Sequence, residues 1–302
     1  MTTTTIIPDI HADPFRLEAS LNAAGSNQMA FLGDFIDAGK GTSMSDDLAV
    51  LKQVRKLIDD GRASAVMGNH ELNAILYHRE DQQGRPLRAH SEKNQAQHKS
   101  FLDQFDVGSK DALQWTEWFL TLPLWQEDDR LRLVHACWDQ HAVDTISSRR
   151  PDGRLHPMDL EEVAAKETPF ALAVEKLTSG PEIDLPQGYQ FHDSKDVPRQ
   201  QVRIAWWRAA QGTWRDVALS VPNVLELPDE PVANIEGFAV SSENEPPVLV
   251  GHYKMQGDLK IDSPKASCID FPEAPCVYHW SGETTLTTDN LELCRKRTQS
   301  VI

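Results

Sequence analysis

Five short polar fragments carry residue types that bind metal ions, and each follows a short apolar run. In chain order the fragments are Asp9-Ile10-His11, Gly33-Asp34-Phe35-Ile36-Asp37, Gly68-Asn69-His70-Glu71, His135 and His252. Carboxylate oxygen, imidazole nitrogen and amide oxygen form a ligand set of intermediate hardness, which suits manganese, iron or zinc. Two ions in such a site lie ~3.5–4 Å apart and share a bridging ligand. The fragments therefore predict a dinuclear site in which the carboxylate of Asp34 is the bridge.

The set of fragments is more informative than any one of them. A lone Asp-x-His pair, or a lone histidine after a strand, is more often a structural feature than a ligand. The segment Gly68–Glu71 is more specific, because it places an amide, an imidazole and a carboxylate on consecutive residues at a strand end. Five such fragments in order, each at the end of a strand, make coincidence an improbable explanation.

The elements that position these fragments follow a strand–helix–strand rhythm. Apolar runs predict strands at Thr4–Ile7, Met29–Leu32, Ala63–Met67, Leu131–Val134, Val248–Val250, Ala266–Asp270 and Val277–Trp280. Between the second and third strands, apolar residues at spacings of three and four predict an amphipathic helix over residues 45–60. This alternation is typical of an α/β fold. Ligands of open α/β sheets bind beyond the carboxyl ends of the strands, where the polar fragments lie.

The segment from residue 139 to residue 245 differs in character from the rest. It is rich in proline and holds the aromatic and basic run Trp206-Trp207-Arg208. We interpret it as an insertion that forms a cap over the site. Residues 1–138 and 246–302 are then expected to form the core.

Bulk properties disfavour several classes of function. The formal net charge of the 302 residues is −16, which disfavours nucleic acid and anionic membranes as partners. No apolar run has the length of a bilayer span, and the start of the chain lacks the pattern of a signal peptide. The four cysteines form no Cys-x-x-Cys pair, so free thiols are expected. We expect a cytoplasmic protein, and the sequence carries no signal for an oligomeric state.

The ordered fragments resemble the calcineurin-like metallophosphoesterase superfamily. They are most similar to the PPP type, which includes the Ser/Thr protein phosphatases and the symmetrical diadenosine tetraphosphatases. Gly33–Ser43 resembles that family's GD-x-VDRG segment, and Gly68–Glu71 matches its GNHE segment in full. The resemblance implies a four-layer α/β/β/α sandwich with an inserted cap region. It also implies a phosphoric ester hydrolase that uses water activated by two metal ions, manganese most often and iron or zinc as alternatives.

The resemblance also implies a role for each matching residue. Asp9, His11 and Asp34 would bind the first metal ion, and Asp34, Asn69, His135 and His252 would bind the second. His70 would be the general acid that protonates the leaving oxygen, and Asp37 would orient His70. Glu71 is either a partner that orients a ligand or a residue that favours the start of the next helix. Lys254 stands where the wider superfamily often has a further histidine ligand, which favours the PPP type.

One departure from the pattern concerns the binding of substrate. Ala38 replaces an arginine that grips the substrate phosphate in the PPP type, and a guanidinium is difficult to replace in that role. Lys40, Arg203 and Arg208 are the candidates for a substitute cation. The alternative is that all three are ordinary surface residues and that Trp206 and Trp207 only pack inside the cap.

Three functions are compatible with these residues. The first is a phosphomonoesterase similar to the Ser/Thr protein phosphatases, with a phosphorylated protein or small molecule as its substrate. The second is a hydrolase of dinucleoside polyphosphates, in which the aromatic residues of the cap would stack on a base. The third is a regulatory module that binds metal and phosphate with weak turnover, which Ala38 favours. The pairing of Asp37 with His70 argues against the third, because a binding module needs no acid.

The remaining histidines lack this ordered context and are expected mostly at the surface: His78, His90, His98, His141, His156, His192 and His279.

Overall fold

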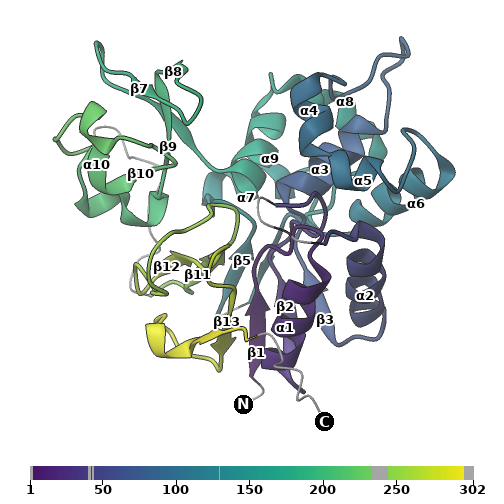
Figure 1. Cartoon of the computed structure of the whole chain (residues 1–302), viewed down its shortest axis with the longest axis horizontal. Helices are drawn as coiled ribbons and strands as arrows, with labels where there is room; N and C mark the ends of the chain where they lie inside the picture. Colours follow the sequence, from purple (N-terminus) through teal and green to yellow (C-terminus); the bar gives the residue numbers. More distant parts are fainter. Residues whose placement is uncertain (1–2, 40–41, 43, 129, 233–243, 296–302) are drawn as a thin grey trace.

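Two β-sheets form the centre of the molecule (Figure 1). The computed structural model describes residues 3–39, 42, 44–128, 130–232 and 244–295. The first sheet has the order β14-β13-β1-β2-β3. Its strands are β1 (Thr4–Ile7), β2 (Gln28–Phe31), β3 (Ala63–Ala65), β13 (Cys276–Trp280) and β14 (Leu291–Leu293). The three N-terminal strands are parallel to one another, and β13 and β14 are antiparallel to their neighbours.

The second sheet brings the two ends of the predicted core together. Its order is β12-β11-β5-β4. The strands are β4 (Trp125–Glu127), β5 (Arg132–Val134), β11 (Val248–Val250) and β12 (Ala266–Cys268). Strand β11 is parallel to both β5 and β12. His135 and His252 are therefore carried beyond the carboxyl ends of two neighbouring parallel strands.

Alternating side chains join the two sheets. Ile6 of β1, Leu133 of β5 and Leu249 of β11 belong to one buried cluster, which also contains residues of β2 and β13. Their chain neighbours Ile7 and Val134 belong to a second, larger cluster that includes residues of the helices. Successive strand residues point to opposite faces of a sheet. The first cluster is therefore the layer between the sheets, and the expected sandwich of helices and two sheets is confirmed.

Helices α1 (Pro14–Ala24) and α2 (Asp47–Asp59) contact the first sheet through β13 and β3. Helix α1 was not predicted, although its start is well marked. Asp13 accepts hydrogen bonds from the backbone N–H groups of Phe15 and Arg16, and Pro14 occupies the first turn. Both features are preferred at helix N-termini. Helix α2 begins one or two residues later than expected, with Asp46 as its N-cap.

Four helices follow β3. They are α3 (Asn69–Tyr77), α4 (Glu92–Gln97), α5 (Lys99–Leu102) and α6 (Lys110–Phe119). Helix α3 begins inside the predicted metal-binding segment, so Asn69 and His70 lie in its first turn. The helices of this group pack near one another, with α3 against α6 and α4 against α5.

The chain leaves the second sheet after β5 and returns to it in β11. The intervening segment begins with α7 (Gln140–Ser147), η1 (Pro157–Asp159), α8 (Leu160–Ala165) and α9 (Pro169–Ser179). It continues with β6 (Glu182–Asp184), β7 (Phe191–His192), β8 (Pro198–Arg199), β9 (Gln201–Ile204), η2 (Trp206–Gln211), α10 (Trp214–Val217), β10 (Ala218–Leu219) and η3 (Val224–Glu226). Strands β10, β9 and β6 form a separate small sheet. In Figure 1 this sheet and α10 lie to one side of the two central sheets.

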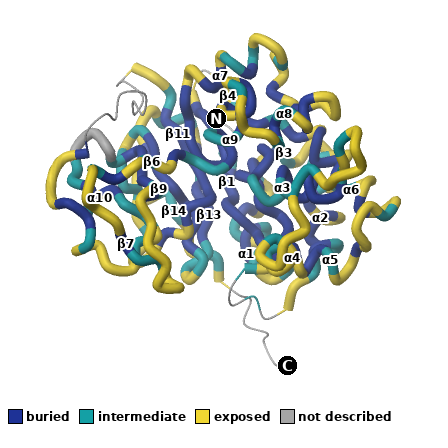
Figure 2. The backbone as a smooth tube through the Cα atoms, turned by 90° about the horizontal axis from the view of Figure 1, so that it is seen from above, coloured by how far each residue is buried: buried dark blue, intermediate teal, exposed yellow. Residues whose placement is uncertain are grey.

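Burial follows the layers of the fold. Figure 2 shows buried backbone along β1, β13 and their neighbours, with exposed segments around the periphery. Helix η4 (Thr288–Asn290) precedes the edge strand β14. Within the described part of the chain, no helix has both the length and the apolar character that crossing a bilayer requires.

Leu249 tests the layer between the sheets. Its side chain is fully buried, and truncation of a buried leucine to alanine typically costs ~2–5 kcal/mol. We expect Leu249→Ala to lower the free energy of unfolding by that amount in urea denaturation. Leu225→Ala is the control, because Leu225 is 71% exposed and a surface change is usually within ~0.5 kcal/mol. Equal effects of the two substitutions would contradict the assignment.

Candidate metal centre

The structure brings the ligand atoms of His135, His252 and Asn69 together at one point. His135 Nε2 and His252 Nδ1 lie 3.0 and 2.9 Å from Asn69 Oδ1 and 3.2 Å from each other. Asp34 Oδ2 lies 3.4 Å from His135 Nε2. These four side chains come from three loops and one helix start, and they are the ones that the sequence assigned to the second metal ion.

The tautomer of His135 leaves a lone pair directed at this point. Its Nδ1 is 2.6 Å from the carbonyl oxygen of Leu32, so Nδ1 carries a proton, and the neutral ring, which is the form that binds a metal ion, has its lone pair at Nε2. The oxygens of Asn69 and Asp34 are acceptors as well. Buried acceptors that face one another without a donor are unfavourable. A cation between them removes the conflict, so this donor set fits a metal ion.

His11 and Asp9 form the second half of the centre on the other side of Asp34. His11 Nε2 lies 3.7 Å from Asp9 Oδ2 and 3.9 Å from Asp34 Oδ2. Its Nδ1 donates to the carbonyl oxygen of Asp37, which leaves Nε2 as an acceptor. This Nε2 atom is buried and has no hydrogen-bond partner among the described residues. An orphaned, inward-facing imidazole nitrogen between two carboxylates fits a metal ligand.

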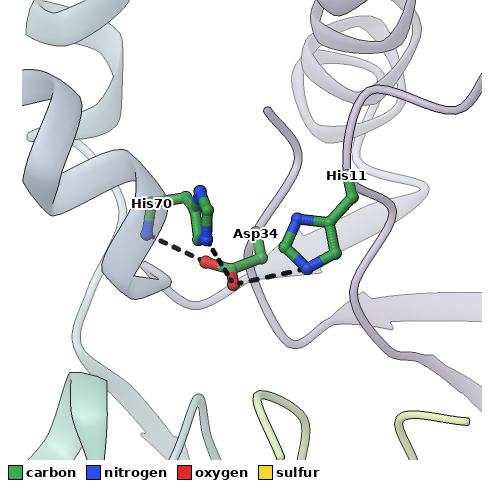
Figure 3. A group of neighbouring side chains, drawn as sticks. All are labelled: His11, Asp34 and His70. Carbon is green, nitrogen blue, oxygen red and sulfur yellow. Dashed lines mark hydrogen bonds and ion pairs between the residues drawn. The ribbon is translucent and has the colours of Figure 1, made fainter. Parts of the chain in front are cut away.

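His70 lies close to the same carboxylate without competing for it. Figure 3 shows His11 and His70 on either side of Asp34, with His70 contacting it through its backbone N–H and its ring. The ring atom Nε2 is 3.9 Å from Asp34 Oδ2. Its other nitrogen, Nδ1, is 2.7 Å from Asp37 Oδ2. His70 is thus oriented by Asp37, while its Nε2 is directed towards the centre.

The buried carboxylates of this region stabilise positive charge, and the pKa values of His135 and His70 are raised as a result. Burial opposes protonation of His135, but the charges of Asp34 and Asp9 outweigh it and raise the pKa of His135 to about 10. Burial likewise opposes protonation of His70, and Asp34 and Asp37 raise its pKa to about 9. Burial raises the pKa of Asp9 well above its usual value, and the neighbouring Asp270 and Asp34 add to the effect. Metal ions would supply the charge that these carboxylates otherwise draw from protons.

Glu71 holds the loop that carries Asp34. Its carboxylate is fully buried and accepts hydrogen bonds from the backbone N–H groups of Asp34 and Phe35 at 2.8 and 2.7 Å. It also accepts from the N–H of Gly68 at 3.0 Å. Glu71 therefore joins the GDFID loop to the GNHE loop, which is the orienting role that the sequence left as one of two alternatives.

Glycine is required where these loops touch. A Cβ atom at Gly68 would overlap the Asp34 carboxylate and lie 2.5 Å from the Asp34 backbone nitrogen. A Cβ atom at Gly251 would overlap the carboxylate of Asp9. Because glycine has no Cβ atom, the backbone at Gly68 can approach Asp34, and the backbone at Gly251 can approach Asp9, more closely than any other residue would permit.

The candidate phosphate-binding residues lie in different surroundings. Arg208 is paired with Asp262, to which its Nε donates at 2.9 Å. Arg203 donates to Glu182 through Nη2 at 3.2 Å, while its Nε is buried without a partner among the described residues. Burial lowers the pKa of His252 well below its usual value, and the charges of His135 and Arg203 lower it further. The charge of Arg203 therefore acts on a residue of the metal centre. Lys40 lies outside the described residues.

Trp206 and Trp207 are packing residues. Their side chains are 1% and 2% exposed. The indole N–H of Trp206 donates to the carbonyl oxygen of Ala136, and that of Trp207 donates to Asp262. Buried rings cannot stack on a base, so the reason given for a dinucleoside substrate does not hold for these two residues.

His78 and His98 are exceptions to the expectation that the remaining histidines lie mostly at the surface. His78 and His98 are 5% and 4% exposed. His98 Nδ1 is 2.7 Å from Asp37 Oδ1, and His78 Nε2 is 3.0 Å from His98 Nε2. No local spacing connects either residue to Asp37, because the contact forms only when α4 and α5 pack on the Asp37 loop. His90, His141 and His156 are exposed as expected.

The chain is similar to one protein family and to several solved structures. A sequence model of the family described as calcineurin-like phosphoesterase matches residues 2–161. Among solved structures, a mutant of a cold-active protein tyrosine phosphatase superposes with a TM-score of 0.52, at 12% identity over 98% of this chain and 81% of that chain. A protein serine/threonine phosphatase from Saccharomyces cerevisiae gives a TM-score of 0.47, at 12% identity over 96% of this chain and 78% of that chain.

A metallophosphoesterase from Sphaerobacter thermophilus is 21% identical, with a TM-score of 0.32. The match covers 45% of this chain and 47% of that chain, so it spans about half of that protein. No curated protein matches the chain. At 12% identity, the superposition with the cold-active phosphatase, whose TM-score is 0.52, supports the fold alone.

Glu71→Gln tests the support of the Asp34 loop. One oxygen that accepts from backbone N–H groups becomes an NH2 donor, so at least one buried hydrogen bond is lost and a donor faces a donor. We expect the affinity for divalent metal to fall ~10–100-fold, measured by metal titration with calorimetry. Glu92→Gln is the matched control, because Glu92 also lies in the first turn of a helix but is exposed. Unchanged affinity in Glu71→Gln would show that this carboxylate does not orient the ligands.

Proposed function

Because this chain belongs to the calcineurin-like phosphoesterases, which makes it a metal-dependent phosphoric ester hydrolase, we propose that it acts on phosphomonoesters in the manner of a serine/threonine protein phosphatase. The observation that carries the proposal is the pair of His70 and Asp37, whose atoms Nδ1 and Oδ2 lie 2.7 Å apart beside the metal centre. A module that only binds phosphate has no use for a positioned acid. A phosphatase needs one to protonate the leaving oxygen.

Each side chain has a defined part in this proposal. Asp9, His11 and Asp34 hold one ion, and Asp34, Asn69, His135 and His252 hold the other. When bound, two divalent ions lower the pKa of water and neutralise the oxygens of the phosphoryl group. His70 keeps a proton at Nε2 and donates it to the leaving oxygen, while Asp37 fixes its orientation at Nδ1. The mixed oxygen and nitrogen ligands favour manganese, with iron and zinc as alternatives.

Two cations are suited to replace the arginine that is missing at Ala38. Arg203 has a buried Nε without a partner among the described residues, and its charge lowers the pKa of His252, for which burial is the largest cause. Lys254 is exposed and lines a hollow of about 710 Å³ together with His11 and Gly39. Its charge contributes to the lowered pKa of His11, for which burial is the largest cause. We propose that Arg203 and Lys254 bind the phosphate and the group attached to it.

The segment from residue 139 to residue 245 is proposed to act as a cap. It supplies Arg203, and Trp206 connects it to the backbone beside His135. The core is then formed by residues 1–138 and 246–302. The four cysteines are free thiols, which fits the cytoplasmic location proposed from the sequence.

The first experiment measures the hydrolysis of an aryl phosphate and of a phosphoserine peptide with and without added Mn²⁺. We expect turnover of both with the metal and loss of turnover after chelation, restored by Mn²⁺. A preference for diadenosine tetraphosphate in the same assay would favour the alternative hydrolase. Absence of turnover with Mn²⁺, Fe²⁺ and Zn²⁺ would falsify the proposal and leave a binding module.

His70→Asn tests the acid. Removal of a positioned general acid typically lowers kcat by ~10²–10⁴, and we expect a decrease in that range while the protein keeps its bound metal. Metal content is measured by atomic emission, and His141→Asn, at an exposed histidine of α7, is the control. A decrease in metal content in His70→Asn would mean that His70 is a ligand.

Arg203→Gln and Lys254→Gln test the phosphate-binding cations. We expect each to raise the KM for the phosphopeptide, with a smaller effect on metal affinity, because each loses a charge-assisted hydrogen bond to substrate. Arg199→Gln is the matched control for Arg203, since Arg199 lies in the neighbouring β8 and is paired with Asp193. If Arg203→Gln and Arg199→Gln have the same KM as the unmodified protein, Arg203 does not contact the substrate.

A further inference from the structure

A chain of buried side chains extends from the catalytic pair into the protein. Asp37 accepts one contact at each carboxylate oxygen, from His70 Nδ1 at Oδ2 and from His98 Nδ1 at Oδ1, both at 2.7 Å. His98 Nε2 then lies 3.0 Å from His78 Nε2. The chain ends at the backbone N–H of Gly108, which donates to His78 Nδ1 at 3.1 Å.

The direction of every hydrogen bond in this chain follows from Gly108. A backbone N–H can only donate, so His78 Nδ1 is an acceptor and neutral His78 carries its proton at Nε2. That proton is donated to His98 Nε2, which leaves the proton of neutral His98 at Nδ1. His98 Nδ1 therefore donates to Asp37. The arrangement gives His98 the one neutral tautomer that can hold the carboxylate.

The surroundings of His98 hold this arrangement in place. Its ring stacks on Phe101, with centroids 4.8 Å apart and an interplanar angle of 16°, and it also contacts the ring of Tyr77. Burial lowers the pKa of His78 to about 4, and the neighbouring histidines and Arg79 act in the same direction. His78 therefore stays neutral, as the donor role requires.

The same elements also hold the backbone around Asp37. Ser100, two residues after His98, accepts from the N–H of Ala38 at 2.9 Å. The N–H of Asp37 donates to Asp47 of α2 at 2.9 Å. Asp37 itself has a positive φ of 65°, a conformation that costs free energy in a residue other than glycine. The junction of α4 and α5 and the start of α2 together stabilise this strained loop.

We propose that His98, kept in its Nδ1–H tautomer by His78, is a positioning residue that fixes the carboxylate of Asp37 so that its other oxygen orients His70 towards the leaving group. This inference rests on the proposed function, because it assigns His98 to the orientation of the proposed acid. His98 acts through Asp37 and does not contact the substrate. Without the hydrogen bond from His98, the carboxylate of Asp37 can rotate away from His70, and the ring of His70 is then no longer held in one orientation.

The dependence on the leaving group separates this role from simple packing. An alkyl phosphate such as phosphoserine needs protonation of its leaving oxygen much more than an aryl phosphate does, since an aryloxide is the more stable anion. We expect His98→Ala to lower kcat for the phosphoserine peptide ~10–100-fold, the usual effect of losing an orienting partner. For p-nitrophenyl phosphate we expect a clearly smaller decrease. KM and metal content should stay unchanged.

His98→Asn provides the rescue. The NH2 group of an asparagine side chain occupies nearly the same place as histidine Nδ1–H and can donate to Asp37. We expect His98→Asn to recover most of kcat for the phosphoserine peptide, whereas His98→Ala does not. His90→Ala is the matched control, because His90 also stacks on the ring of Tyr77 but its Nε2 lies 2.9 Å from the carbonyl oxygen of Tyr77 rather than near Asp37. Equal decreases for both substrates, without recovery in His98→Asn, would overturn the proposal and leave a packing role.

A measurement on the unmodified protein avoids dependence on variants that fail to fold. The ¹⁵N chemical shifts of the histidine rings in the zinc-loaded protein report which nitrogen carries the proton. We expect His98 to be protonated at Nδ1 and bare at Nε2, and a proton at Nε2 with bare Nδ1 would overturn the proposal. This readout needs no turnover, so a failure of the proposed function would appear separately, as absence of hydrolysis with all metals.

Discussion

The buried negative charge of Asp34 is the constraint around which the centre is arranged. Its carboxylate is 2% exposed and lies between His135 on one side and His11 on the other. Burying an ionised carboxylate is costly unless positive charge is supplied. The charges of His135 and His70 overcome the effect of burial and lower the pKa of Asp34 well below its usual value. Asp34 therefore stays ionised and is available to both halves of the centre at once.

The side chains around the Asp34 carboxylate lie in loops whose backbone angles differ from those of helices and strands. His11, Asp34, Asp37 and His252 all have positive φ angles between 51° and 70°, which L-residues adopt at a cost. The cost is offset by the contacts of the loops, above all by the three backbone N–H groups that converge on Glu71. Residues with positive φ thus recur in the loops of the candidate metal centre, which follow regular strands. The sheets thus serve to bring four irregular loops to one edge.

Most residues of this centre could be predicted from the sequence, because each lies in a short polar fragment close to the end of a strand. The strands β1 and β11 have the predicted bounds, and each polar fragment begins within three residues of the end of its strand. Helix α1 was missed because its apolar face is weak, although Asp13 and Pro14 are recognisable signals of a helix start. His98 and Arg203 differ from these cases. Their relation to the centre depends on how α4, α5 and the small sheet pack, and no spacing in the chain records it.

The hydrogen bond from the indole of Trp206 to the carbonyl oxygen of Ala136 is 3.0 Å long and buried. It ties the region that differs most in composition from the core to the residue that follows His135. Exchange of this region between relatives would be expected to preserve chemistry only if an indole or an equivalent donor is kept at the junction. If residues 139–245 act as the proposed cap, we expect relatives to differ in substrate preference through its outer residues and to keep this junction.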